Sequence, residues 1–173
     1  SYGDCDEPDY YTAGLRGAED IQATLDLMHR QRYVAPDRSI VIGQSAGGWA
    51  TLALSSRNPR GVAGMINVAG GRGGQQQLAD GRIGNCKAGE LVKAAGRYGE
   101  TARVPVLWMY AANDVFFGPT LAQRMVDAYN KAGGHGIYRP LGEVDGNGHT
   151  FVGDAGGVQF WEKPVSRFLD GLK

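Results

Sequence analysis

The sequence predicts an α/β fold, in which a parallel sheet has helices on both faces, formed by a single domain of residues 1–173. Short β-branched runs alternate along the chain with segments whose apolar residues recur every three or four positions. Alternating strand and helix patterns are typical of parallel sheets. A chain of 173 residues is long enough for one core, and it contains neither an internal repeat nor a linker that would divide it.

The first half of the chain predicts a helix, a strand, a second helix and a second strand. These elements span residues 15–33, 39–43, 46–58 and 62–68. Pro36 and Pro59 end the two helices, because the residue before a proline avoids helical backbone angles. Both strands are continuous apolar runs, which predicts that each is buried on both faces of the sheet.

The second half predicts two more strands and three helices after an irregular loop. The loop spans residues 69–85, the strands 104–110 and 137–141, and the helices 90–98, 119–131 and 158–172. Pro119 stands at a favoured first-turn position of its helix. Pro164 is expected to kink or split the last helix.

Charge and composition exclude several classes of function. Lys+Arg and Asp+Glu balance at 18 each without a basic stripe, so we expect no nucleic acid partner. No apolar run approaches the roughly 20 residues that a membrane span needs. The cysteines lack metal-ligand spacing, and Asp4, Asp6, Glu7 and Asp9 are typical of a solvated acidic turn. We therefore expect neither a metal nor a cofactor.

A G-x-S-x-G pattern spans Gly43 to Gly47, directly after one predicted strand and directly before a helix. A nucleophile elbow requires this context, because a sharp turn exposes the serine hydroxyl above the sheet edge. Ser45 is the candidate nucleophile, and the backbone N–H of Ala46, at the helix N-terminus, is the candidate oxyanion donor. The alternative is a glycine-rich turn that contains an incidental serine.

A serine nucleophile needs a base, and three histidines are available. His29 falls inside the first predicted helix, and His135 falls in the glycine-rich segment that ends the fourth. His149 lies in a loop between the last strand and the last helix, at the edge of the sheet where Ser45 is expected. We therefore predict that His149 is the base, against the alternative of a solvated loop histidine.

The third member of such a site is a carboxylate that orients the imidazole. Asp114 directly follows the strand at 104–110, so it is predicted at the same edge of the sheet. The alternative is that Asp114 serves only as a turn or helix-cap residue. Glu143 and Asp145 compete because they are closer to His149 in sequence, but they follow the last strand. The order Ser45, Asp114, His149 is the one expected for this architecture.

These residues predict a serine esterase that acts on a small-molecule acyl substrate through an acyl-enzyme. A peptide-bond substrate would use the same groups, so a serine peptidase is the second hypothesis. The third is a catalytically inactive fragment or binding module.

The chain resembles the α/β-hydrolase superfamily, and within it the dienelactone-hydrolase-like and prolyl-oligopeptidase-like group. Three segments carry the likeness: IVIGQSAGGWATLAL, VPVLWMYAANDVFFGP and DGNGHTFVG. The resemblance covers residues 15–173 and implies that Ser45, Asp114 and His149 are nucleophile, acid and base. Dienelactone hydrolases proper use a cysteine nucleophile, so Ser45 indicates a different activity.

The resemblance also bears on the two cysteines. On the residues alone, Cys5 and Cys86 are either unrelated thiols or one disulfide. Similar sequences tend to have both cysteines and are often exported. The resemblance therefore favours a Cys5–Cys86 disulfide and a periplasmic or secreted location, with the cytoplasm as the alternative.

The chain departs from this family at its start. Family members have several strands before the segment that begins here, and the loop after one of them donates the second oxyanion N–H. We expect a partial α/β-hydrolase fold that lacks the N-terminal strands, that is, the C-terminal portion of the fold. The elbow strand would then have an open edge, and we expect a partner chain or self-association to cover it.

Overall fold

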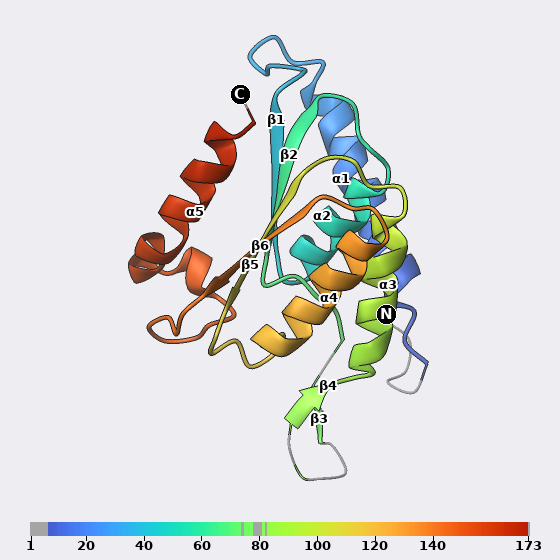
Figure 1. Ribbon diagram of the computed structural model, residues 1–173. Coiled ribbons are helices and arrows are strands. Elements are labelled where there is room, and N and C mark those ends of the chain that lie inside the picture. Colours follow the sequence, from blue (N-terminus) through green and yellow to red (C-terminus); the bar gives the residue numbers. More distant parts are fainter. Residues whose placement is uncertain (1–6, 74, 78–80, 82, 173) are drawn as a thin grey trace.

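Four parallel strands form the central sheet of the computed structural model, which describes residues 7–73, 75–77, 81 and 83–172 (Figure 1). Their order across the sheet is β1-β2-β5-β6. The strands are β1 (Ser39–Gln44), β2 (Val62–Val68), β5 (Val106–Ala111) and β6 (Gly136–Leu141). All three pairings are parallel, so the carboxyl ends of the four strands lie at one edge of the sheet.

Helices cover both faces of this sheet, as the sequence predicts. Figure 1 shows α5 on one side of the sheet and the other α-helices together on the opposite side. Those other helices are α1 (Tyr10–Met28), α2 (Ala46–Ser55), α3 (Ala88–Gly99) and α4 (Pro119–Lys131). The last helix, α5, spans Val158–Asp170 and follows the short 3-10 turns η1 (Phe151–Gly153) and η2 (Ala155–Gly157). Each face has its own buried cluster, and the larger one lies under the four helices.

The first helix begins earlier than its apolar pattern predicts. It starts at Tyr10 rather than Leu15, because the side chain of Asp9 caps it by accepting a 2.9 Å hydrogen bond from the backbone N–H of Thr12. This bond holds the pKa of the Asp9 carboxyl below its usual value. The helix also ends at Met28, before the predicted end at Tyr33.

The prediction that the first strand is buried on both faces is wrong. β1 pairs with β2 alone among the described strands and therefore forms an edge of the sheet. Val41 is buried against the larger cluster, but Ile40 and Ile42, which face the other side, are 37% and 57% exposed. A β-branched run shows that a segment is a strand, and its burial depends on neighbours that the run does not specify.

Two further predictions need correction. The loop at 69–85 contains two short strands, β3 (Gln75–Gln77) and β4 (Ile83–Asn85), which pair as an antiparallel hairpin beyond the sheet (Figure 1). Pro164 does not split the last helix, because α5 continues through it to Asp170.

The predicted disulfide involves Cys5, which lies outside the described residues. Cys86 is buried, and its backbone carbonyl accepts a 2.6 Å hydrogen bond from the hydroxyl of Tyr10. The start of α1 therefore lies beside Cys86, but the Cys5–Cys86 pairing stays a prediction.

Within the described part of the chain, none of the helices combines the length and the apolar character needed to cross a membrane.

The exposed edge of β1 leads to a prediction about association. An edge strand with exposed apolar side chains is a template for pairing with another chain. Replacing Ile42 by Lys places a charge on this edge, and because Ile42 is 57% exposed the stability should change by less than about 0.5 kcal/mol. We expect wild-type protein to self-associate as its concentration rises in static light scattering, and Ile42→Lys to stay monomeric.

The matched control is Leu27→Lys, which changes a similarly exposed apolar residue on α1. It should associate like wild type. Equal association of wild type and Ile42→Lys would contradict the role of this edge.

Candidate active site

Ser45 forms the sharp turn between β1 and α2. Its backbone angles are φ 54° and ψ −120°, and a positive φ is uncommon for any residue other than glycine. Backbone hydrogen bonds hold the turn: Ser45 N donates to Val68 O at 3.0 Å, and Ser45 O accepts from Trp49 N at 3.0 Å and Gly71 N at 3.2 Å. A non-glycine residue in this conformation persists only where its surroundings impose it, and such strain is concentrated at functional sites.

The two glycines of the motif have different environments. A Cβ atom at Gly43 would collide with the backbone carbonyl of Gly47 and with the hydroxyl of Thr51. A Cβ at Gly47 would meet no atom within 4 Å outside its own chain neighbours and helix backbone. Of these two motif glycines, only Gly43 is therefore required by the close approach of strand to helix.

The imidazole of His149 lies beside the hydroxyl of this turn. Its Nε2 is 2.9 Å from Oγ of Ser45, and only 8% of the residue is exposed. The loop is fixed on both sides: Gln44 Nε2 donates to the carbonyl of His149 at 2.7 Å, and the N–H of His149 donates to Oδ1 of Asn147 at 2.9 Å. Gln44 therefore ties the histidine loop directly to the end of the strand that carries Ser45.

The carboxylate of Asp114 lies on the far side of the same ring. Its Oδ2 is 3.2 Å from His149 Nδ1, and its Oδ1 accepts hydrogen bonds from the N–H groups of Phe116 at 2.8 Å and Phe117 at 3.1 Å. Asp114 is 5% exposed. The two backbone donors fix the carboxylate so that its second oxygen faces the imidazole.

A neighbouring asparagine joins the acid loop to the histidine loop. Asn113 Nδ2 donates to Val144 O at 2.9 Å, and Val144 N donates back to Asn113 Oδ1 at 3.1 Å. The rings of Phe116 and Phe117 pack on the imidazole, with centroids 4.7 and 5.6 Å from its own. Packing and hydrogen bonds together limit the rotation of His149.

A buried polar chain supports the turn from behind. The hydroxyl of Tyr110 donates to Gly70 O at 2.7 Å and accepts from Asn67 Nδ2 at 3.1 Å. Complete burial raises the pKa of the Tyr110 phenol far above its usual value, so it remains a donor. This chain holds the segment from which Gly71 N reaches the carbonyl of Ser45.

The competing residues lie elsewhere. Glu143 and Asp145 are exposed, and Asp114 has the place beside the imidazole. His29 Nε2 bonds the hydroxyl of Ser39, at the start of β1, and His135 precedes β6. Both of these histidines therefore lie at the opposite edge of the sheet from Ser45.

The structure thus brings Ser45, His149 and Asp114 together in one hydrogen-bonded series. Ala46 is the first residue of α2, so its N–H has no acceptor within the helix. Among the described residues there is no cluster of His, Cys, Asp or Glu that could hold a metal ion.

Sequence reasoning missed Gln44, Asn113 and Asn147. The spacing Asn-Gly-His could have indicated Asn147, because asparagine side chains commonly bond the backbone two residues on. Gln44 and Asn113 bond the backbone of distant loops, and no local pattern marks such contacts.

Comparisons with known proteins place the fold. No protein-family model and no curated protein matches the sequence. Solved structures do match. A monoacylglycerol lipase from Paleococcus ferrophilus has a TM-score of 0.64 at 11% identity, over 94% of this chain and 77% of the lipase. A Klebsiella pneumoniae protein provisionally named a dienelactone hydrolase has a TM-score of 0.60 at 15% identity, over 86% of this chain and 58% of that protein.

Dipeptidyl peptidase 4 from Porphyromonas gingivalis has a TM-score of 0.59 at 18% identity, over 92% of this chain and 22% of the peptidase. At identities this low, the structural matches show a shared fold alone. The chain therefore has part of the α/β-hydrolase fold, and it spans less than two thirds of the length of the Klebsiella pneumoniae protein and of the peptidase. The expected partial α/β-hydrolase fold is confirmed.

The different environments of the motif glycines give a matched pair of substitutions. Gly43→Ala should lower the free energy of unfolding by about 2 kcal/mol, because its methyl group collides with backbone that cannot move independently. Gly47→Ala should leave that free energy unchanged or raise it slightly, because alanine favours the helix. Urea denaturation of both variants measures the difference. Equal stability of the two would contradict the packing described for this turn.

Proposed function

We propose that the chain carries the catalytic residues of a serine hydrolase that cleaves carboxylic esters through an acyl-enzyme. One observation carries the proposal: Ser45 Oγ, the two ring nitrogens of His149 and Asp114 Oδ2 form a continuous series with steps of 2.9 and 3.2 Å. A serine hydroxyl is a poor nucleophile alone, and such a series makes it reactive.

Each group has a defined role in the proposed reaction. Ser45 Oγ attacks the acyl carbonyl while His149 Nε2 accepts its proton. Asp114 holds Nδ1–H in place and stabilises the imidazolium that forms. His149 then passes this proton to the leaving alcohol. In the second step His149 takes a proton from water, whose oxygen attacks the acyl-enzyme, and gives it to Ser45 Oγ as the acid leaves.

The N–H of Ala46 is the oxyanion donor that we assign. At the start of α2 it combines an unpaired donor with the positive end of the helix dipole. Removal of one oxyanion donor typically slows a hydrolase by about a hundred- to a thousand-fold, so the Ala46 N–H is a substantial part of the proposed catalysis.

A peptide substrate is the second candidate, and the likeness to dipeptidyl peptidase 4 favours it. Assays with p-nitrophenyl acetate and with a chromogenic dipeptide separate the two substrate classes. Turnover of the ester alone would end the peptidase hypothesis, and turnover of the dipeptide alone would end the esterase hypothesis.

We also propose a periplasmic or secreted location, which rests on the predicted Cys5–Cys86 disulfide.

A fluorophosphonate probe tests the nucleophile directly. We expect the wild-type chain to be labelled and Ser45→Ala to remain unlabelled. On the ester that is turned over, His149→Ala and Asp114→Asn should each lower kcat by about 10³- to 10⁴-fold, because the base or its correct tautomer is lost.

The matched controls are His135→Ala and Asp145→Asn, which change exposed residues outside the hydrogen-bonded series. Both should retain wild-type kcat. Folded wild-type protein that the probe fails to label would instead support the inactive fragment.

A further inference from the structure

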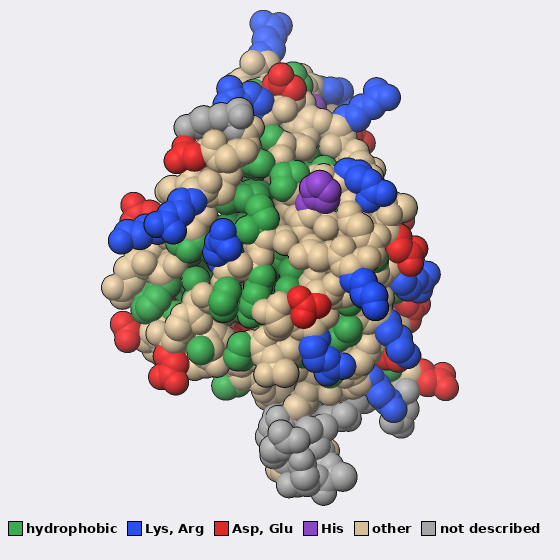
Figure 2. Space-filling model, viewed as in Figure 1, with side chains coloured by type: hydrophobic (Ala, Val, Ile, Leu, Met, Phe, Trp, Pro, Cys, Tyr) green, Lys and Arg blue, Asp and Glu red, His purple; other side chains and the backbone are tan. Residues whose placement is uncertain are grey.

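A groove separate from Ser45 lies between α5 and the sheet. It encloses about 200 Å³, and its floor is formed by Leu107 and Ile137, which are paired in register across β5 and β6. Figure 2 shows a band of exposed hydrophobic side chains in the middle of this face of the molecule. The helical wall is formed by residues spaced three and four apart on one side of the helix and just beyond its end: Pro164, Arg167, Phe168, Gly171 and Leu172.

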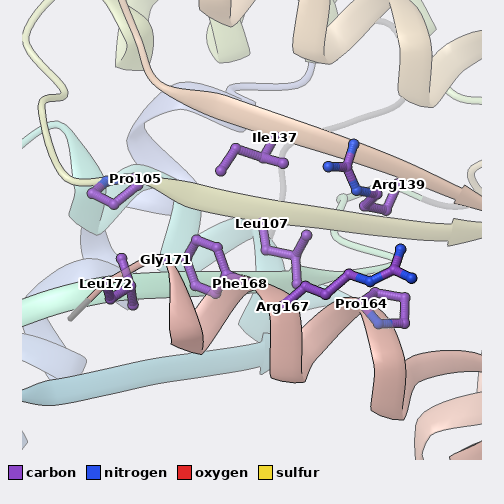
Figure 3. A pocket seen from close by; sticks show the side chains of 9 residues that line it. All are labelled: Pro105, Leu107, Ile137, Arg139, Pro164, Arg167, Phe168, Gly171 and Leu172. Atoms are coloured by element: carbon purple, nitrogen blue, oxygen red, sulfur yellow. The ribbon is translucent and has the colours of Figure 1, made fainter.

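Two arginines lie at one end of this groove. Arg139 follows Ile137 by two residues on β6 and therefore faces the same side of the sheet. Figure 3 shows its guanidinium and that of Arg167 at the end near Pro164, whereas Pro105 lies at the opposite end. The groove is therefore cationic at one end and apolar along the rest.

No Asp or Glu lines the groove, and among the described residues no carboxylate forms an ion pair with either arginine. Arg139 uses Nη1 to bond the carbonyl of Tyr138 at 3.1 Å, and a guanidinium has five N–H donors in all. Donors are thus available for an anion.

We propose that the groove binds a single-chain fatty carboxylate, with its head at Arg139 and Arg167 and its alkyl chain over Leu107, Ile137 and Phe168. Guanidinium groups match carboxylates in charge and in planar geometry. The apolar floor removes methylene groups from water. The volume is below the roughly 300–1,000 Å³ of pockets for drug-sized ligands, so the ligand should be smaller than these. The proposal is independent of any reaction at Ser45.

Isothermal titration of the full chain with decanoate, below its micelle concentration, tests this site. Decanol and decyltrimethylammonium serve as neutral and cationic probes with the same alkyl chain. We expect decanoate to bind with a stoichiometry of one, and the other two probes to bind at least about tenfold more weakly because the arginines select an anion. This comparison needs no variant.

Substitutions then locate the site. Arg139→Gln and Arg167→Gln should each weaken decanoate binding by about tenfold or more, and both residues are exposed, so the fold should persist. The matched control is Arg124→Gln, an exposed arginine on α4 across the sheet, which should bind decanoate like wild type. The proposal is overturned if decanoate shows no saturable binding or if decanoate and decanol bind equally. It is also overturned if Arg139→Gln, Arg167→Gln and Arg124→Gln all bind decanoate with the same affinity.

Discussion

The common direction of the four strands is the constraint on which the site depends. Because β1, β5 and β6 all run the same way, the segments that follow them leave one edge of the sheet. Ser45, Asp114 and His149 come from these three segments. In the sequence His149 is 104 residues from Ser45 and 35 residues from Asp114, and the parallel strands bring all three together. One antiparallel strand in place of β5 or β6 would move its residue to the opposite edge.

The packing around Ser45 offsets the strain in its backbone. A non-glycine residue with φ near 54° costs about 1–3 kcal/mol in backbone energy. The turn is held on one side by α2, whose residues from Gly48 to Ser55 are buried, and on the other by the Asn67–Tyr110–Gly70 chain. The same packing that stabilises the fold therefore keeps the hydroxyl exposed towards His149.

The sequence was sufficient to predict the parallel sheet and the three residues of the hydrogen-bonded series, because the alternation of strands and helices along the chain and the positions of the loops follow from local patterns. It could not predict the exposure of Ile42, which depends on whether another strand lies beside β1. It missed the hairpin of β3 and β4, whose strands are three residues each and carry no alternating apolar pattern. It also missed Gln44 and Asn113, because bonds between distant loops leave no periodic signal.

The most direct test of the account is a crystal structure of the chain after reaction with a small alkyl fluorophosphonate. The account predicts phosphorus bonded to Ser45 Oγ, a phosphonyl oxygen facing the N–H of Ala46, and His149 still bonded to Asp114. Phosphorus on another residue, or a phosphonylated Ser45 with its imidazole turned away from Asp114, would contradict it.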